Sequence, residues 1–267
     1  MDFSKLEEEL IRISEEVGSM IRSSQEELKK EDVREKKVHD LVTSVDEKAE
    51  RLFVESLSEL LPEAGFITEE GTRSDQGAEY DWVIDPLDGT TNFVHGIPSY
   101  CTSVALIKDG NPVLGVVHEV VHRESFHAIK GEGARMNGDP ISVSPNEAFG
   151  DSLIVTGFPG RYFERIEAYM EVFKELLLKT RGARRLGSAA ADLCYVACGR
   201  FDVFYEFGLK PWDVAAGALI VEEAGGRVTD FSLGRDAIFG REIIASNGNV
   251  HAPFYELFSR IYPVPSS

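Results

Sequence analysis

The spacing of apolar residues changes along the chain and predicts helices before strands. Apolar residues recur at helical spacing from Phe3 to about Lys30. A second segment with the same period runs from about Val45 to Leu61, and Pro62 follows it directly. Because proline cannot continue a helix, we expect the second helix to end there.

The segment from Tyr100 to Lys130 has the short, β-branched apolar runs of strands. Asp109-Gly110 separates Ser103–Lys108 from Pro112–His118, which is a strong hairpin signal, and Ser125–Ile129 extends the same sheet. A turn-rich stretch follows. The first half of the chain is therefore expected to pack helices on a largely antiparallel sheet.

Strands and helices alternate from Ser152 onward, which favours an α/β layer. The only candidate linker is Pro145–Asp151. We therefore predict two subdomains that share one site, residues 1–148 and 149–267. The elements predicted after the linker are strands at Leu153–Thr156, Val203–Phe207, Arg227–Asp230 and Ile243–Ala245, and helices at Phe163–Lys179, Ser188–Cys198 and Trp212–Ala224.

Composition narrows the class of protein. With 267 residues, 43% of them hydrophobic, the chain can bury a large core. Its net charge of −18 repels nucleic acid and anionic membranes, so neither is an expected partner, although solubility is the ordinary role of such a charge. The same charge repels phosphate esters, whose binding would need local cations.

The remaining features of composition favour a reducing compartment. Cys101, Cys194 and Cys198 are too few and too irregularly spaced for a disulfide framework or a zinc site. The chain has neither a signal-like start nor an apolar run of membrane length. We therefore expect a cytoplasmic protein.

The segment Trp82–Asn92 carries the most informative chemistry. An apolar run that indicates a buried strand ends at Asp85 and Asp88, and Gly89-Thr90-Thr91 then leads into a predicted helix start. Carboxylates bind hard cations such as Mg²⁺, with Asp85 able to bridge two cations, Asp88 to bind one and the Leu87 carbonyl to add a ligand. Amide groups at a helix start bind phosphate. Metal and phosphate would thus meet at one point, as in phosphoryl transfer or phosphate hydrolysis.

Further acids are candidates for this site, and each has an ordinary alternative. Glu69, in a Glu-Glu pair, follows another short apolar segment, although such a pair is usually solvated. Asp213 is either a metal ligand or the N-cap of the following helix. Asp46 is equally a ligand candidate or part of a helix cap with Ser44 or Thr43. Glu206 ends an aromatic strand, where it either binds a substrate hydroxyl or is exposed at an edge.

Three other patterns are weaker. Arg161, Arg184 and Arg185 either hold a second phosphate or offset the acidic surface. His118-Glu119-Val120-Val121-His122 matches the zinc-peptidase pattern H-E-x-x-H, which requires a helix. Here it follows a strand, where the two histidines would stand ~13 Å apart, so we interpret it as a chance match. Gly131-Glu132-Gly133 lacks the third glycine of a dinucleotide-binding loop.

Taken together, these motifs resemble the inositol monophosphatase family of Mg²⁺-dependent, lithium-sensitive sugar phosphatases, over nearly the whole chain. The resemblance implies a layered αβαβα sandwich of the sugar phosphatase type, within the α/β class, and a homodimer. The motifs that carry it are Leu41–Asp46, Phe66–Glu70, Trp82–Asn92, Arg185–Ala190, Pro211–Gly217 and Glu222–Gly226.

The resemblance also implies a role for each site residue. Two or three Mg²⁺ ions would be bound, with Li⁺ as an inhibitor, and their ligands would be Glu69, Asp85, the Leu87 carbonyl, Asp88 and Asp213. Gly89 and Thr90 would present amide groups to the phosphate. Asp46 would hold the Thr90 hydroxyl, which with Glu69 would orient the attacking water. The contacts to the alcohol half of the substrate would be Gly187, Ser188, Ala189, Glu206 and Asp213.

The implied function is hydrolysis of inositol monophosphate or a similar phosphorylated polyol or sugar. Alternatives are fructose-1,6-bisphosphatase or dual-specificity activity, a nucleotide 3′-phosphatase, a regulatory protein that uses the fold for protein contacts and, formally, a zinc peptidase. Gly157–Arg161 lies where inositol- and fructose-bisphosphate-directed members of the family differ. A family lysine before the Asp46 motif corresponds to Lys36 or Lys37.

Overall fold

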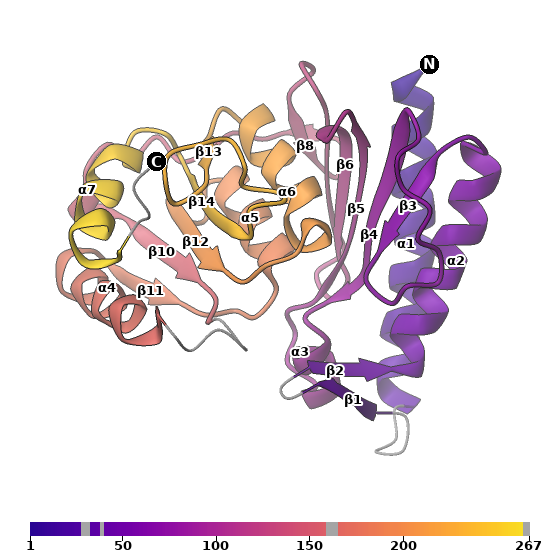
Figure 1. Ribbon diagram of the computed structural model, residues 1–267, viewed down its shortest axis with the longest axis horizontal. Coiled ribbons are helices and arrows are strands. Elements are labelled where there is room, and N and C mark those ends of the chain that lie inside the picture. Colours follow the sequence, from indigo (N-terminus) through magenta and orange to yellow (C-terminus); the bar gives the residue numbers. More distant parts are fainter. Residues whose placement is uncertain (28–32, 38–39, 159–164, 264–267) are drawn as a thin grey trace.

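Helices and sheets follow one another as five layers across the molecule (Figure 1). The computed structural model describes residues 1–27, 33–37, 40–158 and 165–263. Helices α1 and α2 form one outer layer, and a seven-stranded sheet lies beneath them. Helices α5 and α6 form the middle layer, a five-stranded sheet follows, and α4 and α7 cover its far face. This order matches the predicted αβαβα sandwich.

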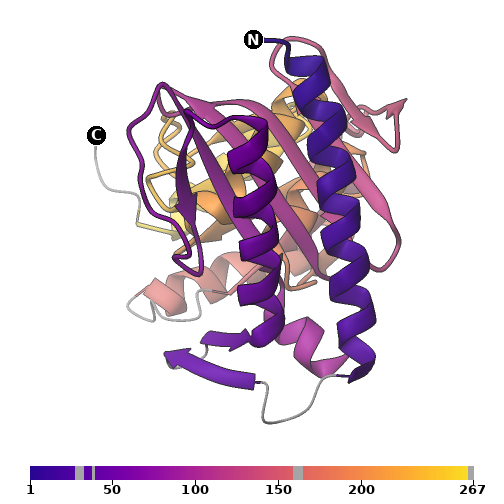
Figure 2. The same cartoon turned by 90° about the vertical axis from the view of Figure 1, so that its right-hand side faces the viewer.

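The first outer layer is a pair of amphipathic helices, α1 (Phe3–Glu27) and α2 (Ser44–Leu60), which lie side by side on one face of the sheet (Figure 2). Helix α1 begins where predicted, and its predicted end at Lys30 lies outside the described residues. Helix α2 ends just before Pro62, as predicted. The α1 residues buried against the sheet are Leu6, Leu10, Ile13, Val17 and Ile21, at helical spacing.

The seven-stranded sheet has its strands in the order β3-β4-β5-β6-β7-β8-β9. It is antiparallel throughout except for the parallel pair β3 and β4, so the predicted character of this half is confirmed. Asp109 and Gly110 form the predicted hairpin turn between β5 and β6, both with positive φ. The strands are β3 (Gly65–Thr68), β4 (Tyr80–Asp88), β5 (Cys101–Lys108), β6 (Asn111–Glu119), β7 (Glu124–Ile129), β8 (Ala134–Met136) and β9 (Asp139–Pro140).

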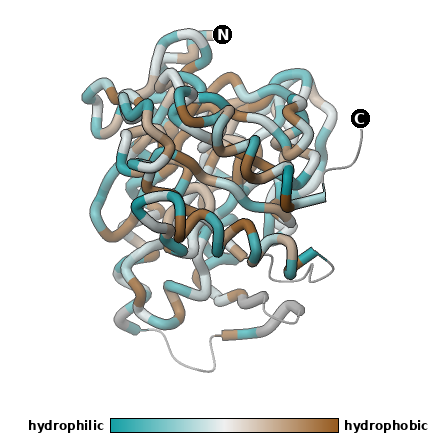
Figure 3. Tube along the Cα trace, turned by 90° about the vertical axis from the view of Figure 1, so that its left-hand side faces the viewer, coloured by the Kyte–Doolittle hydropathy of each residue, from teal (hydrophilic) through white to brown (hydrophobic). Residues whose placement is uncertain are grey.

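The five-stranded sheet has the order β11-β10-β12-β14-β13 and is mixed. Its strands are β10 (Leu153–Thr156), β11 (Gly182–Arg184), β12 (Val203–Phe207), β13 (Arg227–Thr229) and β14 (Glu242–Ser246). Its helices are α4 (Ile166–Lys179), α5 (Ala189–Ala197), α6 (Pro211–Glu223) and α7 (His251–Ile261). Apolar and polar stretches follow one another along the outer layer, as expected of helices with one buried and one exposed face (Figure 3).

Several elements add to the predicted set, among them β8 and β9 in the stretch interpreted as turn-rich. Strands β1 (Val33–Lys37) and β2 (Asp40–Thr43) form a separate two-stranded sheet, and α3 (Thr90–His95) is the short helix whose start the sequence indicated. Strand β11 and helix α7 were not predicted. The predicted linker contains a short 3₁₀ turn, Phe149–Asp151. All of β3–β9 precede residue 149 and all of β10–β14 follow it, while the division into subdomains stays a prediction.

The middle layer depends on small residues. Helices α5 and α6 are rich in alanine, and Gly217 of α6 faces Leu193 of α5 so closely that an added Cβ would lie 2.7 Å from the Leu193 Cβ. Gly115 of β6 similarly leaves room for the Ala216 backbone, 3.0 Å from where its own Cβ would stand. The two helices can therefore approach each other and the sheet closely. Among the described residues, no helix is long and apolar enough to cross a membrane.

We predict that Gly217→Val lowers the free energy of unfolding by about 2 kcal/mol, because overpacking a tight core contact costs ~1–3 kcal/mol and outweighs the helix propensity gained. The measurement is urea unfolding. Gly150→Ala is the matched control, since an added Cβ there meets nothing closer than 3.7 Å. Equal stability of the two variants would contradict the close packing of α5 on α6.

Candidate active site

The end of β4 presents two carboxylates on the same side of the sheet. In a regular strand Asp85 and Asp88, three residues apart, would face opposite sides. The pairing with β5 is irregular here: Asp85 lies opposite Ser103 and Asp88 opposite Cys101, so three residues of β4 span two of β5. Such a bulge turns both acids toward the middle layer of helices. Asp85 is almost fully buried, and its Oδ1 accepts a hydrogen bond from the Leu87 amide at 3.0 Å.

Glu69 and Asp213 join these two acids from other elements. Glu69 directly follows β3, and its amide donates to the Ile84 carbonyl at 3.2 Å, which holds it beside β4. Asp213 lies in the first turn of α6 as its third residue, not as the predicted N-cap, and its Oδ2 accepts from the Lys210 amide at 2.7 Å. The structure thus brings together four of the predicted metal ligands, Glu69, Asp85, Asp88 and Asp213.

The four acids repel one another strongly. Burial, followed by the charges of Glu69, Asp88 and Asp213, raises the pKa of Asp85 well above its ordinary value. The pKa of Asp213 is also raised well above its ordinary value, by burial and by its acidic neighbours. Burial raises the pKa of Asp88 to about 6, although hydrogen bonds from Ala190 and Ser188 oppose the shift. A cation would remove this repulsion.

The donor set fits a hard divalent cation. Carboxylate oxygens and the Leu87 carbonyl are the ligands that Mg²⁺ prefers. Within the described part of the chain, no three His, Cys, Asp or Glu side chains already meet closely enough to hold one ion. The fit therefore rests on the chemistry of the donors and on the mutual repulsion of the acids, not on a preformed coordination geometry.

Asp46 serves the helix cap and the site at once. Its Oδ2 accepts hydrogen bonds from the Thr43 amide (2.9 Å) and the Thr43 hydroxyl (2.5 Å), which completes the capping box of α2. Its Oδ1 lies 2.9 Å from the Thr90 hydroxyl. Asp46 is fully buried, and burial raises its pKa above the ordinary value. The predicted helix cap is therefore confirmed on one oxygen, while the other oxygen contacts Thr90.

A cavity of about 180 Å³ opens beside the acids. Burial raises the pKa of Glu206 at its wall to about 8, against the opposing charge of Arg185. The Gly157 backbone lies directly against the Glu206 carboxyl, where a larger residue would overlap it. The cavity is lined by Asp88, Gly157, Arg185, Gly187, Ser188, Ala189, Asp192, Glu206, Leu209 and Asp213, which include all the predicted contacts to the alcohol half.

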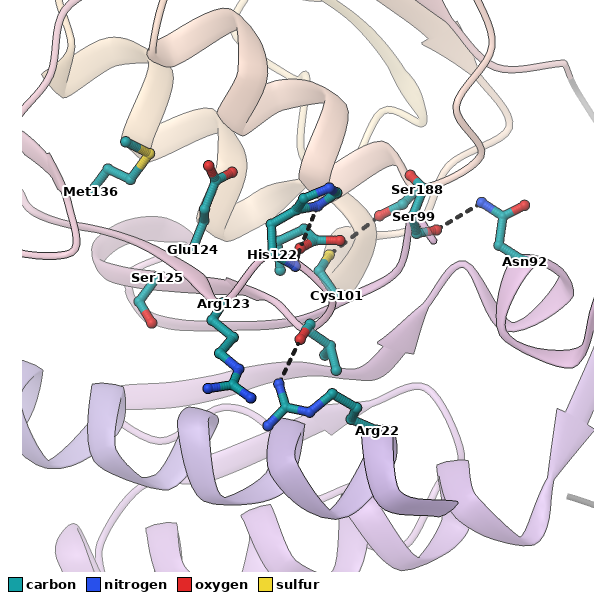
Figure 4. A network of polar contacts seen from close by, with 12 residues as sticks. Arg22, Asn92, Ser99, Cys101, His122, Arg123, Glu124, Ser125, Met136 and Ser188 are labelled. Carbon is teal, nitrogen blue, oxygen red and sulfur yellow. Dashed lines mark hydrogen bonds and ion pairs between the residues drawn. The ribbon is translucent and has the colours of Figure 1, made fainter. Parts of the chain in front are cut away.

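The start of α5 links this cavity to β4. The Ser188 hydroxyl and the Ala190 amide both donate to Asp88 Oδ2, at 2.8 and 2.7 Å. Ser188 is also the N-cap of α5, and its Oγ lies 3.3 Å from the Cys101 sulfur of β5 (Figure 4). Nearby, the Asn92 side chain donates to the carbonyls of Ser99 and Leu186, both at 2.7 Å. Contacts from both sides of residue 149 therefore hold the site together.

Not every candidate joins the site. Of the three arginines, Arg185 lines the cavity, Arg184 donates to its neighbour's carbonyl at 3.0 Å, and Arg161 lies outside the described residues. The side chains of Lys36 and Lys37 lie outside them as well. Asp192 was not predicted, although a single acid in the apolar run of α5 was visible in the sequence.

The segment that matches the zinc-peptidase pattern is strand and turn rather than helix, as predicted. His118 pairs with Ser125 through Nδ1 at 2.9 Å. His122, labelled in Figure 4, lies 3.1 Å from Glu119 Oε2. The two histidines thus belong to separate hydrogen-bond networks. The glycine pair of 131–133 forms a turn whose amides donate to Glu223 at 2.8 and 2.9 Å.

An αβαβα sandwich with clustered acids and an adjoining cavity defines the sugar phosphatase class. The chain belongs to the inositol monophosphatase family, whose model matches residues 2–261. It is 43% identical over 242 residues to the Nus factor SuhB of Pseudomonas aeruginosa, covering 89% of each chain. It is 42% identical over 235 residues to the chloroplastic phosphatase IMPL1 of Arabidopsis thaliana, covering 85% of this chain and 62% of that one. The structure of the Thermotoga maritima IMPase is similar with a TM-score of 0.87, 34% identity and 98% of each chain covered.

The pKa of Glu206 predicts how stability depends on pH. Because folding raises it from an ordinary 4.5 to about 8, the folded protein holds a proton that the unfolded chain releases. This contribution is fully present below about pH 4.5 and is lost as the pH rises toward 8, by at most about 1.4 kcal/mol per pH unit. We expect Glu206→Gln to lose less stability than the wild type between about pH 5 and pH 8 in EDTA, measured by urea unfolding. If the stabilities of the two proteins change in parallel with pH, the raised pKa of Glu206 is contradicted.

Proposed function

We propose that this protein is a Mg²⁺-dependent phosphomonoesterase that hydrolyses inositol monophosphate or a similar polyol or sugar phosphate. The observation that carries the proposal is the convergence of Glu69, Asp85, Asp88 and Asp213 beside the Asp46–Thr90 pair at the end of β4. Acids that repel one another in a buried place are stable only with a cation or bound protons. Family membership supports the same chemistry.

Separate groups of residues would bind the metal and the phosphate. Glu69, Asp85, the Leu87 carbonyl, Asp88 and Asp213 would hold the metal. Bound Mg²⁺ would activate a water molecule as the nucleophile and stabilise charge on the leaving oxygen. Gly89 is the N-cap of α3 and Thr90 is its first residue, so no acceptor within that helix satisfies their amides, which would donate to the phosphate.

Asp46 and Thr90 would prepare the attacking water. The Thr90 hydroxyl has one proton, with Asp46 Oδ1 at 2.9 Å and the Leu87 carbonyl at 3.0 Å as competing acceptors. When that proton points to the Asp46 carboxylate, a lone pair of the Thr90 oxygen is left to accept a hydrogen bond from the water. Glu69 would orient the water from the other side. Attack on phosphorus would then expel the alcohol in line.

The cavity would bind the alcohol half of the substrate. Gly187, Ser188 and Ala189 form its rim at the start of α5, and Glu206 and Asp213 supply acceptors for hydroxyl groups. A homodimer and a cytoplasmic location are part of the same proposal. A role in protein contacts is a second candidate, because a relative 43% identical to this chain is named a Nus factor.

The direct test measures inorganic phosphate released from inositol-1-phosphate, fructose-1,6-bisphosphate and adenosine 3′,5′-bisphosphate while Mg²⁺ and Li⁺ are varied. We expect release from inositol-1-phosphate that requires Mg²⁺, stops with EDTA and is inhibited by Li⁺. Preference for either bisphosphate would redirect the proposal to the corresponding alternative. No release from any of the three would favour the role in protein contacts.

Asp85→Asn is expected to lower kcat at saturating Mg²⁺ by about a hundredfold or more, because removing one preorganised electrostatic group typically costs 10²–10³. The fold should persist, since the asparagine oxygen can still accept from the Leu87 amide and buried repulsion falls. Circular dichroism and thermal unfolding check the fold. Asp81→Asn, at the opposite end of the same strand, is the matched control. Turnover near the wild-type value in Asp85→Asn would refute the proposed metal site.

A further inference from the structure

Helix α5 buries one acid that the proposed reaction does not use. Asp192 stands among alanine, leucine and cysteine, and only 1% of it is exposed. Its Oδ1 atom is buried and has no hydrogen-bond partner within the described residues. Nearly all buried polar atoms in proteins have a hydrogen-bond partner. An unpaired carboxylate oxygen beside a cavity therefore indicates that a ligand or an ordered water supplies the missing partner.

Asp192 lines the same cavity as Glu206. Taking about 30 Å³ for each water, its roughly 180 Å³ would hold about six water molecules or one small polyol. Burial, followed by the charges of Glu206 and Asp88, raises the pKa of Asp192, while the charge of Arg185 lowers it. Asp192, which carries the unpaired oxygen, therefore belongs to the lining of the alcohol cavity and not to a separate site.

The chemistry of the wall selects the kind of group that fits. A carboxyl group pairs with hydroxyl groups in either protonation state, because its oxygens accept hydrogen bonds and its protonated form also donates one. A second phosphate would face both Glu206 and Asp192, and Arg185 is the one described cation in the lining. The cavity thus favours a neutral, hydroxyl-rich alcohol over an anionic one.

We propose that Asp192 is a specificity-determining residue that accepts a hydrogen bond from a substrate hydroxyl, next to the hydroxyl bound by Glu206. This inference rests on the proposed phosphatase function and deepens it. A substrate hydroxyl would pair with the carboxyl group of Asp192. A ring without free hydroxyls would leave this group unpaired. Sites built in this way reject analogues without the hydrogen-bonding group.

The test compares kcat/KM for inositol-1-phosphate with kcat/KM for cyclohexyl phosphate, which has the same ring without hydroxyls. Asp192→Leu is the main variant, because leucine resembles aspartate in shape and replacing a buried charge by an apolar isostere is often neutral for stability. We expect the ratio of the two values to fall about tenfold or more in Asp192→Leu and Asp192→Ala. Asp192→Asn, whose amide oxygen still accepts, should recover most of the ratio.

Asp151→Ala is the matched control, since this acid is exposed in the 149–151 turn and pairs with Arg181 at 3.1 Å. Its ratio should equal that of the wild type. An unchanged ratio in folded Asp192→Leu would overturn the inference while leaving the phosphatase proposal intact. Unfolding of both the leucine and the alanine variants, with a wild-type-like asparagine variant, would make Asp192 structural and also overturn it. Absence of phosphate release by the wild type would remove both proposals.

Discussion

The convergence of four like-charged carboxylates, with Asp85 buried and the other three partly buried, is the constraint on which the rest of the structure depends. Glu69, Asp85, Asp88 and Asp213 come from β3, β4 and α6, and isolated charges in such a place would be prohibitively costly. Backbone dipoles at two helix starts offset part of this cost. Helices α5 and α6 both begin at the acids, and an amide at the start of each donates to a carboxylate: Ala190 to Asp88 and Lys210 to Asp213. The positive ends of two helix dipoles therefore face the cluster.

This arrangement makes the site a property of the docked layers. Helices α5 and α6 lie between the two sheets, so their starting ends reach the acids only when both sheets pack on them. The small residues of the middle layer set that distance. Ser103 Oγ donates to the Trp212 carbonyl at 3.0 Å, and this bond fixes the start of α6 against β5. Packing of alanine and glycine thus determines where the carboxylates meet.

Much of this could be predicted from the sequence, because periodicity and composition are local signals. The long helices, the hairpin and the motif at Asp85 were identified in this way. The pair β1 and β2 was missed because Val33–Lys37 is mostly charged and shows no alternation. Helix α7 was missed although Phe254, Leu257, Phe258 and Ile261 have helical spacing. Asp192 was not predicted as a site residue because its proposed role depends on Glu206, which only tertiary packing brings to the same cavity.

The ambiguity of single acids has a physical origin in the two oxygens of a carboxylate. Asp46, Asp85, Asp88 and Asp213 each give one oxygen to a backbone amide of the scaffold: Thr43, Leu87, Ala190 and Lys210, respectively. Local sequence therefore indicates a helix cap or a turn, and the carboxylates do make these local hydrogen bonds. Glu206 and Asp192 differ, because neither carboxylate accepts a hydrogen bond from any described residue. Anchored acids can keep a fixed position for a metal, whereas unanchored acids can adjust to the hydroxyl groups of an alcohol. The difference in anchoring separates the proposed metal ligands of this site from the proposed contacts to the alcohol.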